Sequence, residues 1–286
     1  TDDHRMKLIG ARLQRQPKGS IGSIDSSTRS GYGKCLVNLK YGHNKDRDDL
    51  PCTLEVYVYS LTTHEPIYYK RMAGNTSDMV TIRIITNELK ELGIEQDDLT
   101  FMTDRGYCSK ENIGIFHKMD TPFLMCAKVN QTPALDCLLK IEYSNVGLPI
   151  NMEYDAESRL YYAQADAEDF EVVLEEGTVH RVHGVKVNMY MNPEKRLADL
   201  TRVSLKIREE KDRVTSMLSG EIPIPSLKSL NASLTYHQGK LNTTTKMIEF
   251  TYKQEAEDKA FAQCGFFASC MYKYNMNGRS EERRVG

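Results

Sequence analysis

The chain has 286 residues, of which 40% are hydrophobic and 27% charged, and its formal net charge is -2. This length allows one large domain or two small ones with a hydrophobic core, and the sequence contains no run of about 18 apolar residues that would predict a membrane span. The nearly balanced charge does not by itself indicate nucleic-acid binding, so any such contact must come from a local group of basic residues.

The N-terminal residues and the cysteines predict an intracellular protein. The first residues, Thr1 to His4, are polar and acidic and do not form a signal peptide. Because the first residue is not Met, we expect that the natural N-terminus is missing. The seven cysteines are odd in number and show no C-x-x-C spacing, which predicts reduced thiols in a cytoplasmic protein.

Residues 20–127 alternate between strand and helix patterns. Their expected order is β-β-β-α-β-α-β, an α/β arrangement. We expect strands at 19–25, 54–60, from 67, at 99–103 and at 122–127. Apolar residues recur at helical spacing from Val80 to Leu92 before Gly93, and Ser109 can cap a second helix that contains Ile113 and Phe116.

The sequence changes in character after residue 130. Residues 140–190 are acidic and rich in Tyr and Val, with short strand patterns at 160–163 and 185–191. Asn192-Pro193-Glu194 predicts the start of a long helix that ends at Gly220. Its expected apolar stripe consists of Leu197, Leu200, Val203, Ile207, Val214 and Met217. Residues 261–274 predict a returning pair of strands around Gly265.

Two acidic residues each follow a short apolar strand. Asp25 comes after Ile24, and Asp104 comes after Met102 and Thr103. Ligands of open α/β sheets bind where strands end, so these two carboxylates could converge on one site. Carboxylate oxygens suit Mg²⁺, and two such ions can activate the attacking oxygen and stabilise the leaving oxygen of a phosphodiester. Spacing alone leaves the alternative that both residues are ordinary turn or cap residues.

Other familiar sites find little support in the sequence. His180 and His183 form an H-x-x-H pair without a third ligand, and neither a phosphate-binding G-x-x-x-x-G-K-[ST] loop nor a G-x-S-x-G motif occurs.

Four motifs, in this order and at this spacing, resemble the DDE transposases of insertion sequences, the cut-and-paste type. They are Ile24-Asp25-Ser26-Ser27-Thr28, Tyr41-Gly42-His43-Asn44-Lys45-Asp46, Ala73-Gly74-Asn75-Thr76-Ser77-Asp78 and Thr103-Asp104-Arg105-Gly106-Tyr107. The resemblance covers about residues 20–130. It implies an α/β fold with a ribonuclease-H-like mixed-sheet core that is interrupted by a β-rich insertion containing one long helix.

The resemblance also implies a function and a site. Asp25 and Asp104 would be the first and second catalytic carboxylates, and both would bind Mg²⁺ or Mn²⁺. The reaction would be hydrolysis of a DNA phosphodiester at the end of the element, followed by attack of the freed 3′-hydroxyl on target DNA. The expected partner is DNA, on which a homodimer would assemble.

The third acid of that family, a Glu on a helix beyond the insertion, is not found. Glu249, Glu255 and Glu257 precede the closing strand and are poor substitutes. Residues 279–286 resemble the translation of a DNA-sequencing adapter, so we expect a truncated fragment with little or no transposition activity. The expected parts are the end of an N-terminal region (1–19), the first part of the core (20–130), the insertion (131–260), returning core strands (261–278) and the adapter (279–286).

A basic loop near residues 29–47 either contacts the DNA backbone or is simply solvated; its members are Arg29, Lys34, Lys40, Lys45 and Arg47. Three alternatives to a transposase remain open from the sequence. They are a ribonuclease-H-like nuclease that cuts without strand transfer, a catalytically dead DNA-binding remnant, and a non-enzymatic α/β interaction domain. The last would gain support if Asp25 and Asp104 lay far apart in the fold.

Overall fold

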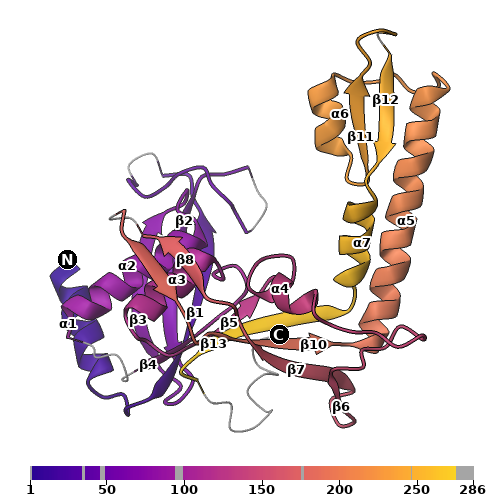
Figure 1. Ribbon diagram of the computed structural model, residues 1–286. Coiled ribbons are helices and arrows are strands. Elements are labelled where there is room, and N and C mark those ends of the chain that lie inside the picture. Colours follow the sequence, from indigo (N-terminus) through magenta and orange to yellow (C-terminus); the bar gives the residue numbers. More distant parts are fainter. Residues whose placement is uncertain are drawn as a thin grey trace. The chain divides into compact units, whose positions relative to one another are not determined.

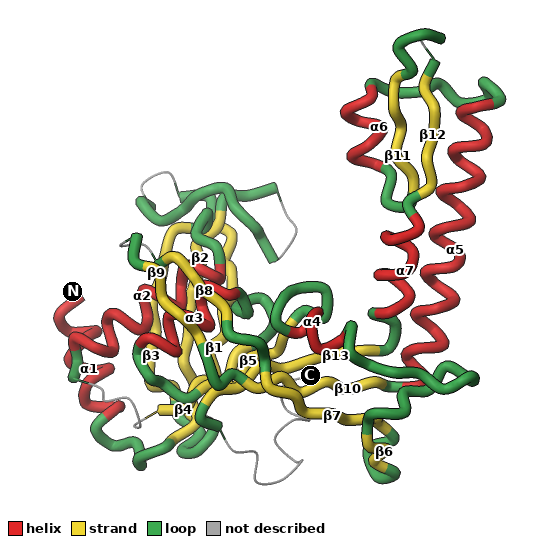
Figure 2. The backbone as a smooth tube through the Cα atoms, in the orientation of Figure 1, coloured by secondary structure: helices red, strands yellow, loops and turns green. Residues whose placement is uncertain are grey.

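The chain folds into two compact units in the computed structural model, which describes residues 2–33, 36–45, 49–93, 99–174, 177–245 and 247–274. The first unit comprises residues 1–137, 164–188 and 268–286, and the second comprises residues 138–163 and 189–267. Figure 1 follows the elements along the chain, and Figure 2 distinguishes helices from strands. In the part of the chain that the structure describes, no helix is both long and apolar enough to cross a membrane.

A mixed sheet forms the centre of the first unit. Its strands are β1 (Ser20–Ser30), β2 (Cys52–Ser60), β3 (Pro66–Ala73), β4 (Leu99–Thr103), β5 (Phe123–Ala127) and β13 (Phe266–Tyr272). The order β3-β2-β1-β4-β5-β13 continues through β10 (Lys186–Met191), β7 (Leu160–Asp166) and β6 (Glu153–Asp155). β1 to β3 are antiparallel, β4 and β5 run parallel to β1, and β13 is antiparallel to β5. The first five strands in this order form a ribonuclease-H-like fold, as expected.

Three helices pack on one face of this sheet: α1 (Asp2–Leu13), α2 (Asp78–Glu91) and α3 (Lys110–Lys118). The ring of Phe116 on α3 lies 5.3 Å from that of Phe101 on β4 and 5.7 Å from that of Phe123 on β5. Arg5 on α1 binds both carboxylate oxygens of Glu88 on α2, each at 2.9 Å. Because these contacts use the face that carries Phe101, the opposite face carries the alternate residues of each strand.

The expected order of elements between residues 20 and 127 is confirmed. α2 ends at its C-cap Leu92, and Gly93 follows with φ of +74°, the conformation expected of a helix-terminating glycine. The Ser109 side chain accepts a hydrogen bond from the Asn112 backbone N–H and caps α3. The sequence did not predict α1.

One expectation about the first strand is wrong. β1 does not end at Asp25, because residues 25–30 continue in antiparallel register with β2, from Asp25 opposite Tyr57 to Ser30 opposite Cys52. The sequence predicted a strand that ended at residue 25 and a basic loop near residues 29–47, whereas Arg29 lies on β1. Ser26 and Thr28 are buried on the helix-covered side, so the segment alternates as a strand does.

Two glycines explain why the Tyr41-Gly42 and Ala73-Gly74 motifs occur together. A Cβ atom on Gly42 would lie 1.9 Å from the Gly74 carbonyl oxygen, and one on Gly74 would lie 2.0 Å from the Cys52 carbonyl oxygen. The Gly74 backbone N–H donates to the Asn38 carbonyl at 3.1 Å. Only residues without a side chain allow the loop after β1 to lie this close to the ends of β2 and β3.

We therefore expect Gly74→Ala to lower the free energy of unfolding by about 2 kcal/mol, because backbone atoms must move to admit the methyl group. Chemical denaturation followed by circular dichroism measures this loss. Gly10→Ala is the matched control, because its Cβ atom would lie 3.6 Å from the nearest side-chain atom, in a helix. The control should be neutral or stabilising by up to about 1 kcal/mol. Equal stability of the two variants would contradict the prediction.

The β8–β9 hairpin of the first unit packs on α3. Its strands are β8 (Phe170–Val173) and β9 (Val179–Val182). Gly114 allows this close packing, since a Cβ atom there would lie 2.4 Å from Val172 Cγ2. His117 Nδ1 lies 2.9 Å from His180 Nε2, and His117 Nε2 lies 3.1 Å from the His183 carbonyl oxygen. The two histidines of the H-x-x-H pair therefore pack against a third that the sequence did not single out.

The second unit contains the long helix that the sequence predicted. Its remaining elements are α5 (Pro193–Leu218), α6 (Leu227–Ser233), β11 (His237–Leu241), β12 (Ile248–Tyr252) and α7 (Gln254–Ala262), and α4 (Ala134–Leu138) lies at its boundary with the first unit. Asn192 caps α5 by accepting a hydrogen bond from the Lys195 N–H at 2.9 Å. The end of α5 packs against α6 and the β11–β12 hairpin through Val214, Met217, Leu230, Leu234, Ile248 and Phe250.

Two details of this unit differ from expectation. Leu197, assigned to the packed stripe of α5, is 70% exposed. Residues 261–274 do not form a pair of strands, because 261 and 262 complete α7 and β13 begins only at Phe266. Gly265 makes the turn between them with φ of +78°, and its N–H donates to Asp199 Oδ2 at 3.1 Å. A short apolar segment fits either a strand or the end of a helix.

Candidate functional site

The structure places Asp25 and Asp104 on neighbouring strands. β1 and β4 are parallel, with Ile24 opposite Thr103, so the next residue of each strand is one of the two acids. Adjacent strands lie roughly 4.8 Å apart, which sets the scale of the separation between the two backbones. Both acids are exposed; Asp25 lies on the face of β1 opposite that of Ile24, and Asp104 is the first residue after β4. A fold that separates these two residues is therefore excluded.

A tight turn fixes the position of Asp104. Its Oδ1 accepts a hydrogen bond from the Gly106 backbone N–H at 2.8 Å, the pattern of an Asx turn. Tyr107 is 1% exposed and anchors the turn in the core. The Asn112 side chain, itself buried, donates to the Tyr107 carbonyl at 2.7 Å. The Asp-Arg-Gly-Tyr motif thus joins β4 to α3 while it presents one carboxylate to solvent.

Asp25 is held by its own strand. Its Oδ1 accepts a hydrogen bond from the Ser26 backbone N–H at 2.7 Å. Asp25 pairs with Tyr57 on β2 and lies one residue beyond the last pair of β1 with β4, Ile24 opposite Thr103, so the pairing with β2 restricts its backbone. Each of the two aspartates therefore uses one oxygen locally and is exposed to solvent, where its second oxygen is accessible to a ligand.

Beside β4, the sheet continues with β5 and β13. Cys126 on β5 is two residues beyond Leu124, the partner of Met102, and it lies opposite Ser269 on β13. Burial, followed by the nearby charge of Asp104, raises the pKa of Cys126 to about 12. Because Mg²⁺ prefers oxygen ligands, the thiol of Cys126 does not suit it.

The two aspartates fit a hard divalent cation. Among the residues that the structure describes, no group of three or more His, Cys, Asp or Glu side chains could hold a metal ion. Mg²⁺ commonly keeps several waters and is held by one or two carboxylates together with a substrate phosphate. Two exposed carboxylates on neighbouring strands meet that requirement.

The acids considered as substitutes for a third ligand belong to the second unit. Glu249 accepts a hydrogen bond from the Asn242 side chain, and Glu257 accepts one from the Tyr252 hydroxyl at 2.6 Å. Asn275 to Gly278 and the adapter-like tail at 279–286 lie outside the described residues. The expectation that the third acid follows Gly278 stays a prediction.

The structure describes three of the five basic residues near positions 29–47, namely Arg29, Lys40 and Lys45, and these three make different contacts. Lys45 Nζ contacts the carbonyl and hydroxyl oxygens of Ser26, and the Lys45 N–H donates to Thr28 Oγ1 at 2.9 Å, so this lysine attaches the loop to β1. Arg29 pairs with Glu55 on β2. Lys40 lines a surface hollow. Lys34 and Arg47 lie outside the described residues.

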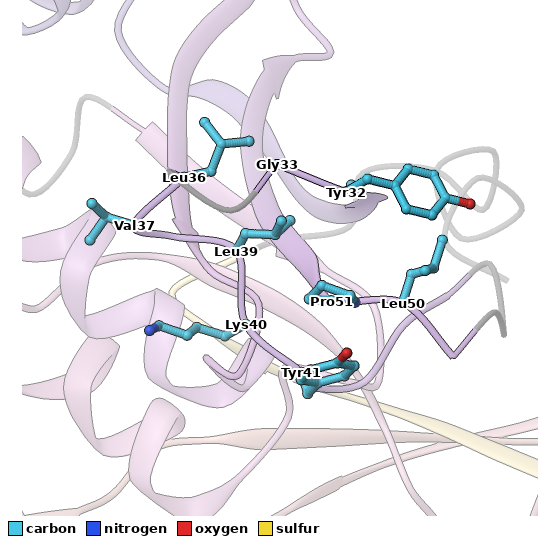
Figure 3. A pocket seen from close by; sticks show the side chains of 10 residues that line it. Tyr32, Gly33, Leu36, Val37, Leu39, Lys40, Tyr41, Leu50 and Pro51 are labelled. Atoms are coloured by element: carbon cyan, nitrogen blue, oxygen red, sulfur yellow. The ribbon is translucent and has the colours of Figure 1, made fainter.

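This hollow has a volume of about 690 Å³ and lies in the connection between β1 and β2. Figure 3 shows Leu50 and Pro51 between the rings of Tyr32 and Tyr41. The two tyrosines are 84% and 75% exposed. The hollow therefore presents aromatic and aliphatic surface beyond the strand that carries Asp25.

Sequence comparison identifies no relative: no protein-family model matches the chain, and no curated protein matches it. Similar solved structures include a piggyBac transposase synaptic complex with hairpin DNA, at 10% identity and a TM-score of 0.37, where the match covers 60% of this chain and 34% of that one. The chain thus spans about a third of that transposase.

Two structures of endonuclease V are also similar. The enzyme of Ciona intestinalis in complex with DNA matches at 14% identity and a TM-score of 0.21, covering 45% of this chain and 59% of that one. The catalytic domain of the human enzyme matches at 13% identity and a TM-score of 0.22, covering 62% and 71%. All three TM-scores are below 0.5, so the functional proposal rests on the strand order and on the residues of the chain itself.

Proposed function

We propose that the chain is part of the catalytic domain of a cut-and-paste DNA transposase of the DDE insertion-sequence type. The observation that carries the proposal is the parallel register of β1 and β4, in which Ile24 lies opposite Thr103, so that the exposed residues Asp25 and Asp104 follow at the same end of two neighbouring strands of a ribonuclease-H-like sheet. The four sequence motifs support the same assignment, because their glycines, turns and caps build the loops around these two residues.

In this proposal Asp25 and Asp104 hold Mg²⁺ or Mn²⁺. The bound ions would supply charge stabilisation to the attacking and leaving oxygens of the phosphodiester. The hydrogen bonds from Ser26 and Gly106 orient the two carboxylates before DNA binds, which lowers the cost of assembling the site. The partner is DNA, both the element end and the target, and a homodimer on DNA belongs to the same proposal.

Metal binding by the 286-residue chain tests the site without requiring turnover. We expect Mn²⁺ to bind, as measured by electron paramagnetic resonance or calorimetry, and we expect Asp25→Asn and Asp104→Asn each to weaken binding at least about tenfold, since one of two charged ligands is lost. Asp166→Asn, which removes another exposed acid of the first unit, is the matched control. Equal affinities of all three variants would exclude the proposed metal site.

A strand-transfer assay separates the proposal from a nuclease that only cuts. With a pre-cleaved DNA end carrying a free 3′-hydroxyl and a supercoiled target, a transposase joins the two DNAs. A protein that cleaves an uncut element end but gives no joined product in this assay would be identified as a ribonuclease-H-like nuclease instead.

A further inference from the structure

We infer that Arg29 and Arg71, held in place by Glu55, form a binding site for DNA phosphates next to the two aspartates. The inference rests on the proposed function and adds residues that the sequence motifs do not include. Arg71 and Glu55 were not recognised in the sequence, and Arg29 was considered only as a member of a basic loop.

Glu55 is the centre of the site. Its side chain is 2% exposed, although it lies on the same face of β2 as Tyr57, which is opposite Asp25. Arg29 Nε approaches Glu55 Oε2 at 3.0 Å, and Arg71 donates from Nε and Nη2 to Glu55 Oε1 at 3.1 and 2.9 Å. The hydroxyl groups of Tyr57 and Tyr69 donate to Oε2 and Oε1 at 2.7 and 3.4 Å.

These contacts determine the charge of the site. Burial alone would raise the pKa of Glu55, but the hydrogen bonds from Tyr57 and Arg71 and the charge of Arg29 outweigh it and hold that pKa below its ordinary value. One carboxylate therefore faces two guanidinium groups, which leaves a net positive charge. Both oxygens of Glu55 are occupied, so Glu55 is not the third metal ligand.

The two arginines remain accessible. The side chains of Arg29 and Arg71 are 72% and 53% exposed, while their shared partner is buried. Glu55 pairs with Nε of Arg29 and with Nε and Nη2 of Arg71, so both terminal NH₂ groups of Arg29 and one of Arg71 are not used by these contacts with Glu55. A guanidinium group with a fixed orientation and exposed NH₂ groups can donate hydrogen bonds to the oxygens of a phosphate. Its pairing with Glu55 already restricts the side chain, so less conformational entropy is lost when DNA binds.

The strand register places this pair beside the aspartates. Ser27 lies opposite Glu55, and Glu55 lies opposite Arg71, so Arg71 lies two residues along the sheet from the level of Asp25. Arg29 lies four residues along β1 from Asp25, which is roughly 13 Å at 3.3 Å per residue. This length corresponds to about four steps of a DNA strand at 3.4 Å each. A DNA strand with its scissile phosphate at the aspartates and its course along β1 towards Ser30 would therefore pass both arginines.

Salt-dependent DNA binding tests the inference. Anisotropy of a fluorescein-labelled duplex, in EDTA and at KCl concentrations from about 50 to 200 mM, gives the slope of log K against log salt. We expect Arg29→Ala and Arg71→Ala each to make the slope shallower by about 0.9, because one phosphate contact is lost, and to weaken binding about eightfold near 0.1 M salt. Arg29→Lys and Arg71→Lys keep the charge and should keep the slope, with affinity about twofold to threefold weaker.

The matched control is Arg181→Ala, which removes another exposed arginine that pairs with a carboxylate, Asp169 on the loop before β8. This control should leave the slope unchanged. If Arg29→Ala and Arg71→Ala behave like the control while the wild-type chain binds DNA, the arginine site is excluded and the proposed function stands. If the wild-type chain shows no salt-dependent binding, both are excluded. The lysine variants show that a loss on alanine substitution does not result from unfolding, because they preserve the pairing with Glu55.

Discussion

Replacing either Asp25 or Asp104 by Ala will reduce Mg²⁺-dependent DNA cleavage at least about a thousandfold, a loss of about 4 kcal/mol of transition-state stabilisation. The protein to use is a longer one in which this chain is followed by a helix that supplies the third acid. The two residues lie on neighbouring parallel strands, so the loss of one carboxylate leaves the other with a single-ligand site. Single-turnover cleavage of a labelled element end measures the effect.

The controls separate a chemical role from a structural one. Both aspartates are exposed, and their side chains accept hydrogen bonds from the backbone N–H groups of Ser26 and Gly106, one and two residues further along the chain, so the variants should fold and bind DNA as the unmodified protein does. Asp166→Ala should cleave normally. Cleavage by the Asp25→Ala or Asp104→Ala proteins at more than about a tenth of the normal rate would exclude the metal-carboxylate mechanism. A longer protein that binds DNA without any cleavage would identify a catalytically dead remnant.

The sequence predicted the core of the first unit because the relevant signals are local. Helix periodicity, the Ser109 cap and Gly93 depend on a few neighbouring residues, and they placed α2 and α3 correctly. The short apolar runs at β4 and β5 are likewise local signals. The two acids were recognised because each follows a short apolar run, and the resemblance of the surrounding motifs to DDE transposases favoured a catalytic role over that of an ordinary turn residue.

The positions that the sequence missed depend on pairing between distant segments. The extension of β1 beyond Asp25 is visible only when residues 52–57 pair with it. Glu55 stands in the apolar run Leu54 to Tyr59, and nothing local shows that Arg29 and Arg71 lie on either side of it. A charged residue inside a strand of this kind is a usable signal, because a buried carboxylate requires partners elsewhere in the chain.

Leu197 and residues 261–274 show the same limit in the second unit. Periodicity identifies a helix, but it does not say where a partner begins to cover it. α5 is longer than the hydrophobic cluster at its end, so Val214 and Met217 are buried and Leu197 is exposed. The turn at Gly265 depends on contacts with Asn192 and Asp199, which lie more than about sixty residues earlier and cannot be read from residues 261–274 alone.

The helix-covered side of the sheet has its own ionic centre, formed by Glu88 on α2. Arg5 binds both Glu88 oxygens at 2.9 Å, Lys70 pairs with Oε1, and the Tyr68 hydroxyl donates to Oε2 at 2.8 Å. The exposed fractions of the side chains are 13% for Glu88, 18% for Arg5 and 26% for Lys70. One carboxylate thus joins α1, α2 and β3, and its removal would leave two partly buried cations without their partner.

We expect Glu88→Gln to lower the free energy of unfolding at pH 7 by about 3 kcal/mol, because breaking a buried ion pair leaves unpaired charge. Burial alone would raise the pKa of Glu88, but the hydrogen bonds from Arg5, Lys70 and Tyr68 hold it below the ordinary value of about 4.3. The stabilisation is therefore complete above about pH 5 and is lost as the pH falls from there through the folded-state pKa. Urea titrations between pH 7 and pH 3 should show that the difference in free energy of unfolding between wild type and Glu88→Gln becomes smaller on acidification. The matched control is Glu91→Gln, at an exposed position of the same helix. Its free energy of unfolding should stay within about 0.5 kcal/mol of the wild-type value throughout. A gap that is absent at pH 7, or that persists unchanged at pH 3, would show that the Glu88 carboxylate does not hold these three elements together.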